Sequence, residues 1–135
     1  MAKRPTSEYL TSQSKFLEHI AEQDGVRHIA KGVLCRVLRS SEGGAKPKAN
    51  SVVGVRYKGE LSSGRVFDST LDSPYPETFR LREVVEGWQI ALVNMRVGDI
   101  WKVYIPAEVG YGMRTIDDIP GGSVLIFEIE LLSVN

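Results

Sequence analysis

The sequence is poor in the side chains that crosslink small domains: it has one cysteine, Cys35, and two histidines, His19 and His28. A single cysteine cannot form a disulfide within the chain, and these three residues do not have the spacing of a structural zinc site. A chain of 135 residues buries roughly two-thirds of its unfolded surface, so one hydrophobic core is enough. We therefore expect one domain-sized unit that needs neither a metal nor a disulfide.

Net charge and long apolar runs are also missing. Seventeen Lys and Arg against seventeen Asp and Glu give a net charge of zero, without the cationic excess typical of nucleic-acid binding. No apolar stretch near the start has the form of a secretion signal, and none approaches the roughly 18 residues of a membrane span. We expect a cytoplasmic protein that binds neither nucleic acid nor membrane. An exported chain whose leader has been removed would show the same pattern.

Motifs for covalent, nucleotide-dependent or metal-dependent catalysis are absent. There is no Gly-x-Ser-x-Gly, no P-loop and no Gly-x-Gly-x-x-Gly. Cys35 lies in an apolar strand pattern, where burial raises the pKa of a thiol and makes it a poor nucleophile. Asp117 and Asp118 form a carboxylate pair, and solvated loop acids explain it better than a metal ion. We expect no cofactor.

Residues 6–24 predict one amphipathic helix, because one face repeats at steps of four, three and four. That face carries Tyr9, Gln13, Phe16 and Ile20, with Leu10, Leu17 and Ala21 beside them. Thr6 or Ser7 can cap the helix, and Gly25 fits the position just after its end.

The apolar face of this predicted helix must be covered, either by the chain's own sheet or by a second chain. A single helix of 19 residues is short for an independent dimerisation module. We expect a monomer in which Phe16, Leu17 and Ile20 pack on the outer face of the sheet, and dimerisation through this helix is the alternative.

After residue 31 the hydrophobic period changes to two, which is typical of half-buried antiparallel strands. The alternating segments are 52–61, 101–105 and 125–131, with shorter candidates at 33–39, 65–69 and 78–81. One helical window, 83–95, interrupts them. Five or six strands with one short internal helix indicate an α+β fold in which that helix lies across the sheet.

Two polar side chains stand out beside aromatic residues. Asp68 directly follows Phe67, and Tyr111 stands between two glycines, where a core tyrosine would be poorly held. A core explains most of the other aromatic residues. A carboxylate and a phenol beside an aromatic cluster instead favour an apolar pocket with a few orienting polar groups, the usual form of a small-ligand or peptide site.

At these residues the sequence resembles the FKBP-type peptidyl-prolyl cis/trans isomerases. The similar segments, in chain order, are 55–61, 64–69, 79–81, 84–88, 95–99, 105–107, 111–112, 119–120 and 125–131. The likeness runs from about Gly32 to Val134, so we expect a lead-in at 1–31 and an isomerase domain at 32–135. The first helix and the segment 24–27 are similar to the lead-in of bacterial members related to macrophage infectivity potentiator, which often dimerise through N-terminal helices.

The resemblance implies a bent antiparallel sheet of five to six strands wrapped around the short helix, with a proline pocket between them. Its substrate-binding residues would be Tyr57, Phe67, Val84, Val85, Trp88, Ile119 and Phe127. Asp68 and Tyr111 would be its polar catalytic groups. This chain departs from the family pattern at Glu77, where an aromatic residue is usual, and at Asp117 and Asp118, where apolar residues are usual.

The activity that the resemblance implies is rotation of X-Pro bonds in peptides and folding proteins without a cofactor. The expected partners are proline-containing peptides, unfolded protein segments and tacrolimus-type macrolide inhibitors. The alternative function is a proline-recognising chaperone or adaptor whose pocket binds with little turnover. The intact set of pocket residues favours the enzyme.

Overall fold

The computed structural model describes residues 4–135. Its elements in chain order are α1 (Ser7–Ala21), β1 (Val26–His28), β2 (Leu34–Arg39), β3 (Val52–Glu60), β4 (Val66–Ser69), β5 (Glu77–Arg80), the 3-10 turn η1 (Leu81–Glu83), α2 (Glu86–Leu92), β6 (Ile100–Ile105), the 3-10 turn η2 (Ala107–Val109) and β7 (Leu125–Val134).

All seven strands form one antiparallel sheet in the order β1-β2-β6-β7-β3-β4, and β5 also pairs with β3. The predicted α+β class is confirmed. The seventh strand, β1, was not expected, because three residues with partly exposed side chains are too short to show an alternating pattern.

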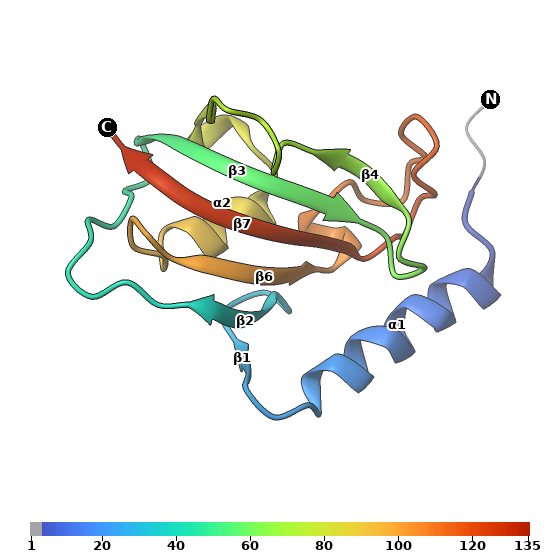
Figure 1. Ribbon diagram of the computed structural model, residues 1–135. Coiled ribbons are helices and arrows are strands. Elements are labelled where there is room, and N and C mark those ends of the chain that lie inside the picture. The colour runs from blue at the N-terminus through green and yellow to red at the C-terminus, as the bar shows by residue number, and fades with distance from the viewer. Residues whose placement is uncertain (1–3) are drawn as a thin grey trace.

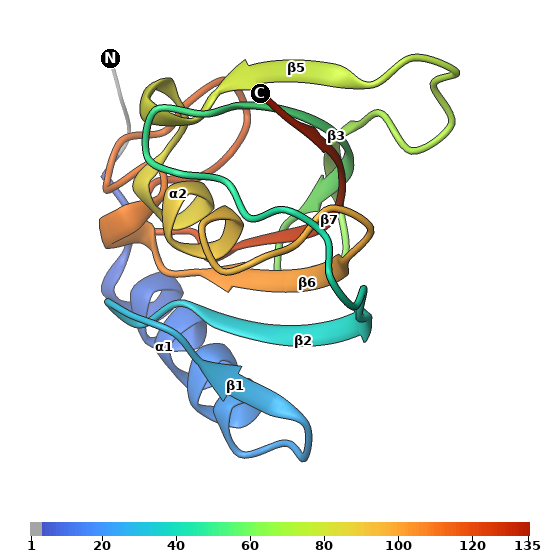
Figure 2. The ribbon, with the colours of Figure 1, turned by 90° about the vertical axis from the view of Figure 1, so that its left-hand side faces the viewer.

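Strand β3 carries two partners along one of its edges. Its first half, Val52–Val55, pairs with β5, and its last residues, Lys58–Glu60, pair with β4. Irregular pairings at Gly54/Val55 and Gly59/Glu60 bend the sheet here. The curved sheet therefore encloses α2, while α1 lies outside it (Figure 2).

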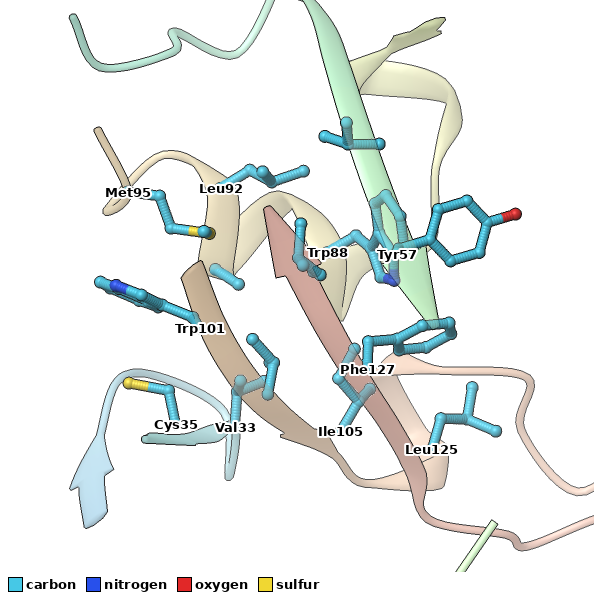
Figure 3. Packing of buried hydrophobic residues seen from close by; sticks show 14 of the residues in the cluster. Val33, Cys35, Tyr57, Trp88, Leu92, Met95, Trp101, Ile105, Leu125 and Phe127 are labelled. Carbon is cyan, nitrogen blue, oxygen red and sulfur yellow. The ribbon is translucent and has the colours of Figure 1, made fainter. Parts of the chain in front are cut away.

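The larger hydrophobic core lies between α2 and the inner face of the sheet, where Trp88, Leu92 and Met95 are buried (Figure 3). Gly87 allows α2 to approach β6, because a Cβ atom there would lie 2.5 Å from Cγ2 of Ile105. Cys35 is buried on β2, and this burial raises the pKa of its thiol, although the charge of Arg27 lowers it in part.

Helix α1 covers the outer face of the sheet, which confirms the predicted packing. Ile20, with Phe16 and Leu17 beside it, forms a second apolar cluster whose members on the sheet side are Leu34, Tyr104, Val124 and Ile126. Figure 2 shows β6 and β2 between α2 on one side and α1 on the other. In the part of the chain from residue 4 onward, no helix is both long and apolar enough to cross a membrane.

The start of α1 matches the prediction, and its end does not. Oγ1 of Thr6 accepts the backbone N–H of Tyr9 at 3.0 Å and caps the helix as expected. The helix ends at Ala21, three residues early, because the backbone N–H of Gln23 bonds back to the carbonyl of Ile20 and tightens the last turn. Gly25, with φ +82°, lies in the turn to β1.

Candidate functional site

A cavity of about 360 Å³ opens between α2, η1 and the strands β3, β4, β5 and β7. Its lining residues are Tyr57, Phe67, Asp68, Phe79, Glu83, Val84, Val85, Trp88, Tyr111 and Phe127. Most of these side chains are apolar or aromatic, and the lining includes two carboxylates and two phenols. This composition fits a site that binds an apolar group and orients it with a few polar contacts.

Trp88 forms the floor of the cavity. Its indole is 4% exposed and meets the rings of Tyr57 and Phe127 edge to face, each at 5.2 Å between ring centroids. Phe79 contacts the same indole at 5.6 Å. Tyr57, Trp88 and Phe127 point toward one another, with the Tyr57 hydroxyl directed away from the core (Figure 3). Such edge-to-face packing fixes the rings and gives the cavity rigid walls.

Gly59 makes room for one of these walls. A Cβ atom at this position would lie 2.7 Å from Cζ of Phe67 and 2.8 Å from Cε1 of Phe127. Without it, the two rings meet edge to face at 5.7 Å. The glycine on β3 therefore allows an aromatic wall built from β4 and β7.

The polar side of the cavity is built on β3 and β4. The hydroxyl of Tyr57 donates a hydrogen bond of 2.5 Å to Oδ2 of Asp68. Burial raises the pKa of Tyr57 above its usual range, and the hydrogen bond and negative charge of Asp68 raise it further. The phenol therefore remains a hydrogen-bond donor at physiological pH and holds the carboxylate at the rim of the cavity.

Tyr111 reaches the cavity from the chain between η2 and β7. Burial raises the pKa of its phenol, and the negative charges of Asp68 and then Asp117 add to this shift. Tyr111 therefore stays protonated as well, and can donate a hydrogen bond to an acceptor bound in the cavity.

The structure gathers eight of the nine predicted site residues around one cavity: Tyr57, Phe67, Asp68, Val84, Val85, Trp88, Tyr111 and Phe127. The ninth, Ile119, is 6% exposed and packs in the core without lining the cavity. Its backbone pairs with Ile116 in an isolated bridge. The binding and catalytic roles of all nine residues stay predictions.

Sequence reasoning missed two lining residues, Phe79 and Glu83. Phe79 was already part of a family-like segment, and its position on a short strand facing an aromatic cluster could have identified it. Glu83 gave no signal, because a charged residue in a turn is usually solvated.

The acidic residues near the cavity differ in their partners. Asp118 forms an ion pair with Arg65, so part of its charge is compensated. Glu77 lies close enough to Tyr57, and Asp117 close enough to Tyr111, for each charge to act on the phenol. Across residues 4–135, no group of three His, Cys, Asp or Glu side chains is placed to hold a metal ion.

Comparison with known proteins relates this site to one family. The model for FKBP-type peptidyl-prolyl cis-trans isomerases matches residues 43–132. The chain is 38% identical to the peptidyl-prolyl cis-trans isomerase Mip of Coxiella burnetii, over 88% of this chain and 52% of that protein. It is 40% identical to an FKBP-type 22 kDa isomerase of Escherichia coli, over 89% and 58%. The chain thus spans about half the length of the curated relatives it matches.

Solved structures give the same result. A peptidyl-prolyl cis-trans isomerase from Pseudomonas syringae pv. tomato has a TM-score of 0.90 and 38% identity to this chain, covering 98% of both chains. The expected cytoplasmic location has no support from the relatives, one of which, from Legionella longbeachae, bears the name outer membrane protein MIP and is 37% identical over 88% of this chain and 51% of that protein.

The raised pKa of Tyr57 predicts a loss of stability at alkaline pH. In the unfolded chain a tyrosine releases its proton near about pH 10. The folded chain holds this proton to higher pH, so the stabilisation is complete below about pH 10 and is lost as pH rises through that value toward the folded pKa. Urea unfolding from about pH 8 to about pH 11 should show this decline, and Tyr57→Phe should make it shallower.

Tyr75→Phe is the matched control, because Tyr75 is 77% exposed and its removal should leave the slope as in the parent. Equal slopes for the parent and Tyr57→Phe would contradict the assignment.

Proposed function

Because the chain belongs to the family of FKBP-type peptidyl-prolyl cis-trans isomerases, we propose that it accelerates the rotation of X-Pro bonds in peptides and folding proteins. The observation that carries this proposal is the aromatic cavity above Trp88, with the hydrogen-bonded pair Tyr57 and Asp68 on its polar side. We assign the isomerase unit to residues 32–135, of which the family model covers 43–132, and the lead-in to residues 1–31.

The chemistry requires no bond to break. Rotation about an X-Pro bond is slow because the amide loses its partial C–N double bond on the way, at a barrier of about 18–20 kcal/mol for peptide bonds in general. The planar amide is more dipolar than the twisted amide and loses more when it leaves water. An apolar cavity therefore disfavours the planar ground state relative to the twisted state. Each 1.4 kcal/mol of this difference is a factor of about ten in rate.

The lining residues have different roles in this reaction. The rings of Trp88, Phe67 and Phe127 bind the prolyl ring, and Val85 borders it. The Tyr111 phenol donates a hydrogen bond to a backbone carbonyl of the substrate. The hydrogen bond from Tyr57 to Asp68 favours a role for Asp68 in orienting Tyr57, so the carboxylate keeps the polar side of the cavity in place.

The direct test is a protease-coupled assay of the parent chain on a short X-Pro peptide. We expect turnover that is unchanged by chelation with EDTA and by alkylation of thiols. A tacrolimus-type macrolide should inhibit it by competing with the peptide for the cavity. Asp68→Leu should lower turnover at least several-fold with the fold kept, because the carboxylate borders the cavity and contributes little to core volume. Asp72→Leu, at an exposed position four residues away, should match the parent.

Trp88→Ala should instead lose both turnover and stability, since truncating a buried Trp typically costs about 3–5 kcal/mol. Peptide binding with no turnover by the parent would replace the enzyme with a proline-binding module. Equal turnover for Asp68→Leu and the parent would remove Asp68 from the site.

The charges around the cavity predict a substrate preference. Asp68 and Glu83 line it, and Glu77 and Asp117 act on its phenols, while no Lys or Arg is among the lining residues described. Exposed charges act through a screened field and contribute at most about 1 kcal/mol each. We expect peptides with Lys or Arg beside the proline to be turned over faster than those with Asp or Glu, and the gap to shrink as salt is raised.

Glu83→Gln should narrow the gap between Lys-Pro and Glu-Pro peptides. Glu42→Gln, on the connection between β2 and β3, is the control and should leave the gap unchanged. Equal turnover of the two peptides at low ionic strength would mean that these acids are only solvated, and that the shape of the cavity sets the preference.

The covered apolar face of α1 leads us to propose a monomer. Ile20, Phe16 and Leu17 pack on the same chain's sheet, so the helix has no large apolar surface left for a second copy. Light scattering at micromolar concentration should give a mass near the 15.0 kDa of one chain. Twice that mass would show dimerisation.

A further inference from the structure

The first half of α1 contacts the chain that carries Tyr111 to the cavity. We call residues 110–122, between η2 and β7, the pocket loop. In Figure 1 this loop lies between β4 and the start of α1. The loop is compact, because the backbone N–H of Gly122 bonds to the carbonyl of Gly112 at 2.9 Å and that of Gly121 to Oγ1 of Thr115 at 3.2 Å. A displacement at its C-terminal end therefore reaches Tyr111 at its other end.

The C-terminal end of the pocket loop is held by Tyr9 and Leu10 of α1. The Ser123 hydroxyl donates to the carbonyl of Pro120 at 2.6 Å. Its hydrogen is thereby committed, so the Tyr9 hydroxyl is the donor in the 2.6 Å contact with Oγ of Ser123. Leu10 packs against Gly122, where a Cβ atom would lie 2.3 Å from Cδ2 of Leu10.

Gln13 connects this end of the loop to a second segment beside the cavity. Its side chain is 5% exposed. Its Oε1 accepts the backbone N–H of Val124 at 2.8 Å, and its Nε2 donates to Oγ of Ser62 at 2.9 Å. Ser62 lies in the turn between β3 and β4, just before the strand that carries Phe67 and Asp68. One buried amide thus joins the two segments that carry the polar groups of the cavity.

The same turn also reaches the pocket loop directly. Arg65 forms an ion pair with Asp118 and donates from Nη1 to its carbonyl at 3.4 Å. The pocket loop is therefore fixed to the β3–β4 turn by Arg65 and, through Gln13, from the side of α1.

Burying a glutamine in an apolar interface costs more free energy than burying an apolar side chain of the same size. Its amide loses water on burial and its side chain loses rotamer freedom, so an unbranched apolar residue would cover the sheet as well at lower cost. Glutamine contributes directional hydrogen bonds. The oxygen and the nitrogen of its amide both find their partners only in one relative placement of Val124 and Ser62.

We propose that Gln13 is a positioning residue of the isomerase site: through it, α1 fixes the pocket loop relative to β4 and so sets the placement of Tyr111 against Asp68. The proposal rests on the proposed isomerase function for its kinetic consequences and on the contacts of α1 alone for its structural ones.

The test begins with Gln13→Met, which keeps the length of the side chain and loses the hydrogen bonds to Val124 and Ser62. Hydrogen–deuterium exchange of the backbone amides of residues 110–124 should become several-fold faster than in the parent. Gln13→Glu should restore slow exchange, because a carboxylate can accept from both the Val124 N–H and the Ser62 hydroxyl. Ile20→Ala is the control on the same helix: it weakens packing on the sheet, Val124 included, and should leave exchange in the pocket loop, residues 110–122, near the parent's.

A double-mutant cycle with Tyr111→Phe separates positioning from general destabilisation. Gln13→Met should lower kcat/KM several-fold in the parent and have a much smaller effect in the Tyr111→Phe background. Ile20→Ala should have the same effect in both backgrounds. If Gln13→Met does not fold, Ser62→Ala removes the acceptor of Gln13 Nε2 in the β3–β4 turn and takes its place in both measurements.

Unchanged exchange in residues 110–124, or equal effects of the variant in both backgrounds, would overturn the proposal. A parent chain without turnover would refute the isomerase function instead. Exchange would then decide alone whether α1 fixes the pocket loop.

Discussion

The packing of Trp88 between the core and the cavity is the contact on which the site depends. The indole stands on α2, and its faces and edges meet aromatic rings from three different strands, β3, β5 and β7. The same side chain therefore contributes to the free energy of folding and forms the floor of the binding site. A fold that did not bend its sheet around α2 would lack both this core packing and the binding site.

The close packing around the cavity depends on two glycines. Gly59 lets the rings of Phe67 and Phe127 meet across β3, and Gly87 lets α2 approach β6 closely. The sheet then supplies rigid walls, while the polar groups come from β4 and from the loop before β7. This division places the groups that orient a ligand on segments tied by hydrogen bonds and ion pairs, and the groups that bind its apolar part in the packed core.

The long strands and the first helix could be predicted from the sequence, because each buries one face and exposes the other. The period of two identified β3, β6 and β7, and the steps of three and four placed Gln13 on the buried face of α1. The resemblance to a family identified eight of the ten cavity-lining residues. The partners of Gln13, the position of Glu83 and the pairing of Arg65 with Asp118 could not be predicted, since each joins segments that are far apart in the sequence or depends on how a turn is oriented.

The order of the strands determines when the cavity can exist during synthesis. The central pairing joins residues such as Tyr57 and Ile129, and β7 lies between β6 and β3. The ribosome makes this strand after all the others in the sheet, so β3 and β6 have no shared neighbour until then. Closing so long a loop is entropically costly and slows folding. A nascent chain therefore leaves one edge of β3 and one edge of β6 unpaired until residues 125–134 emerge, and the proposed folding catalyst is itself a late folder.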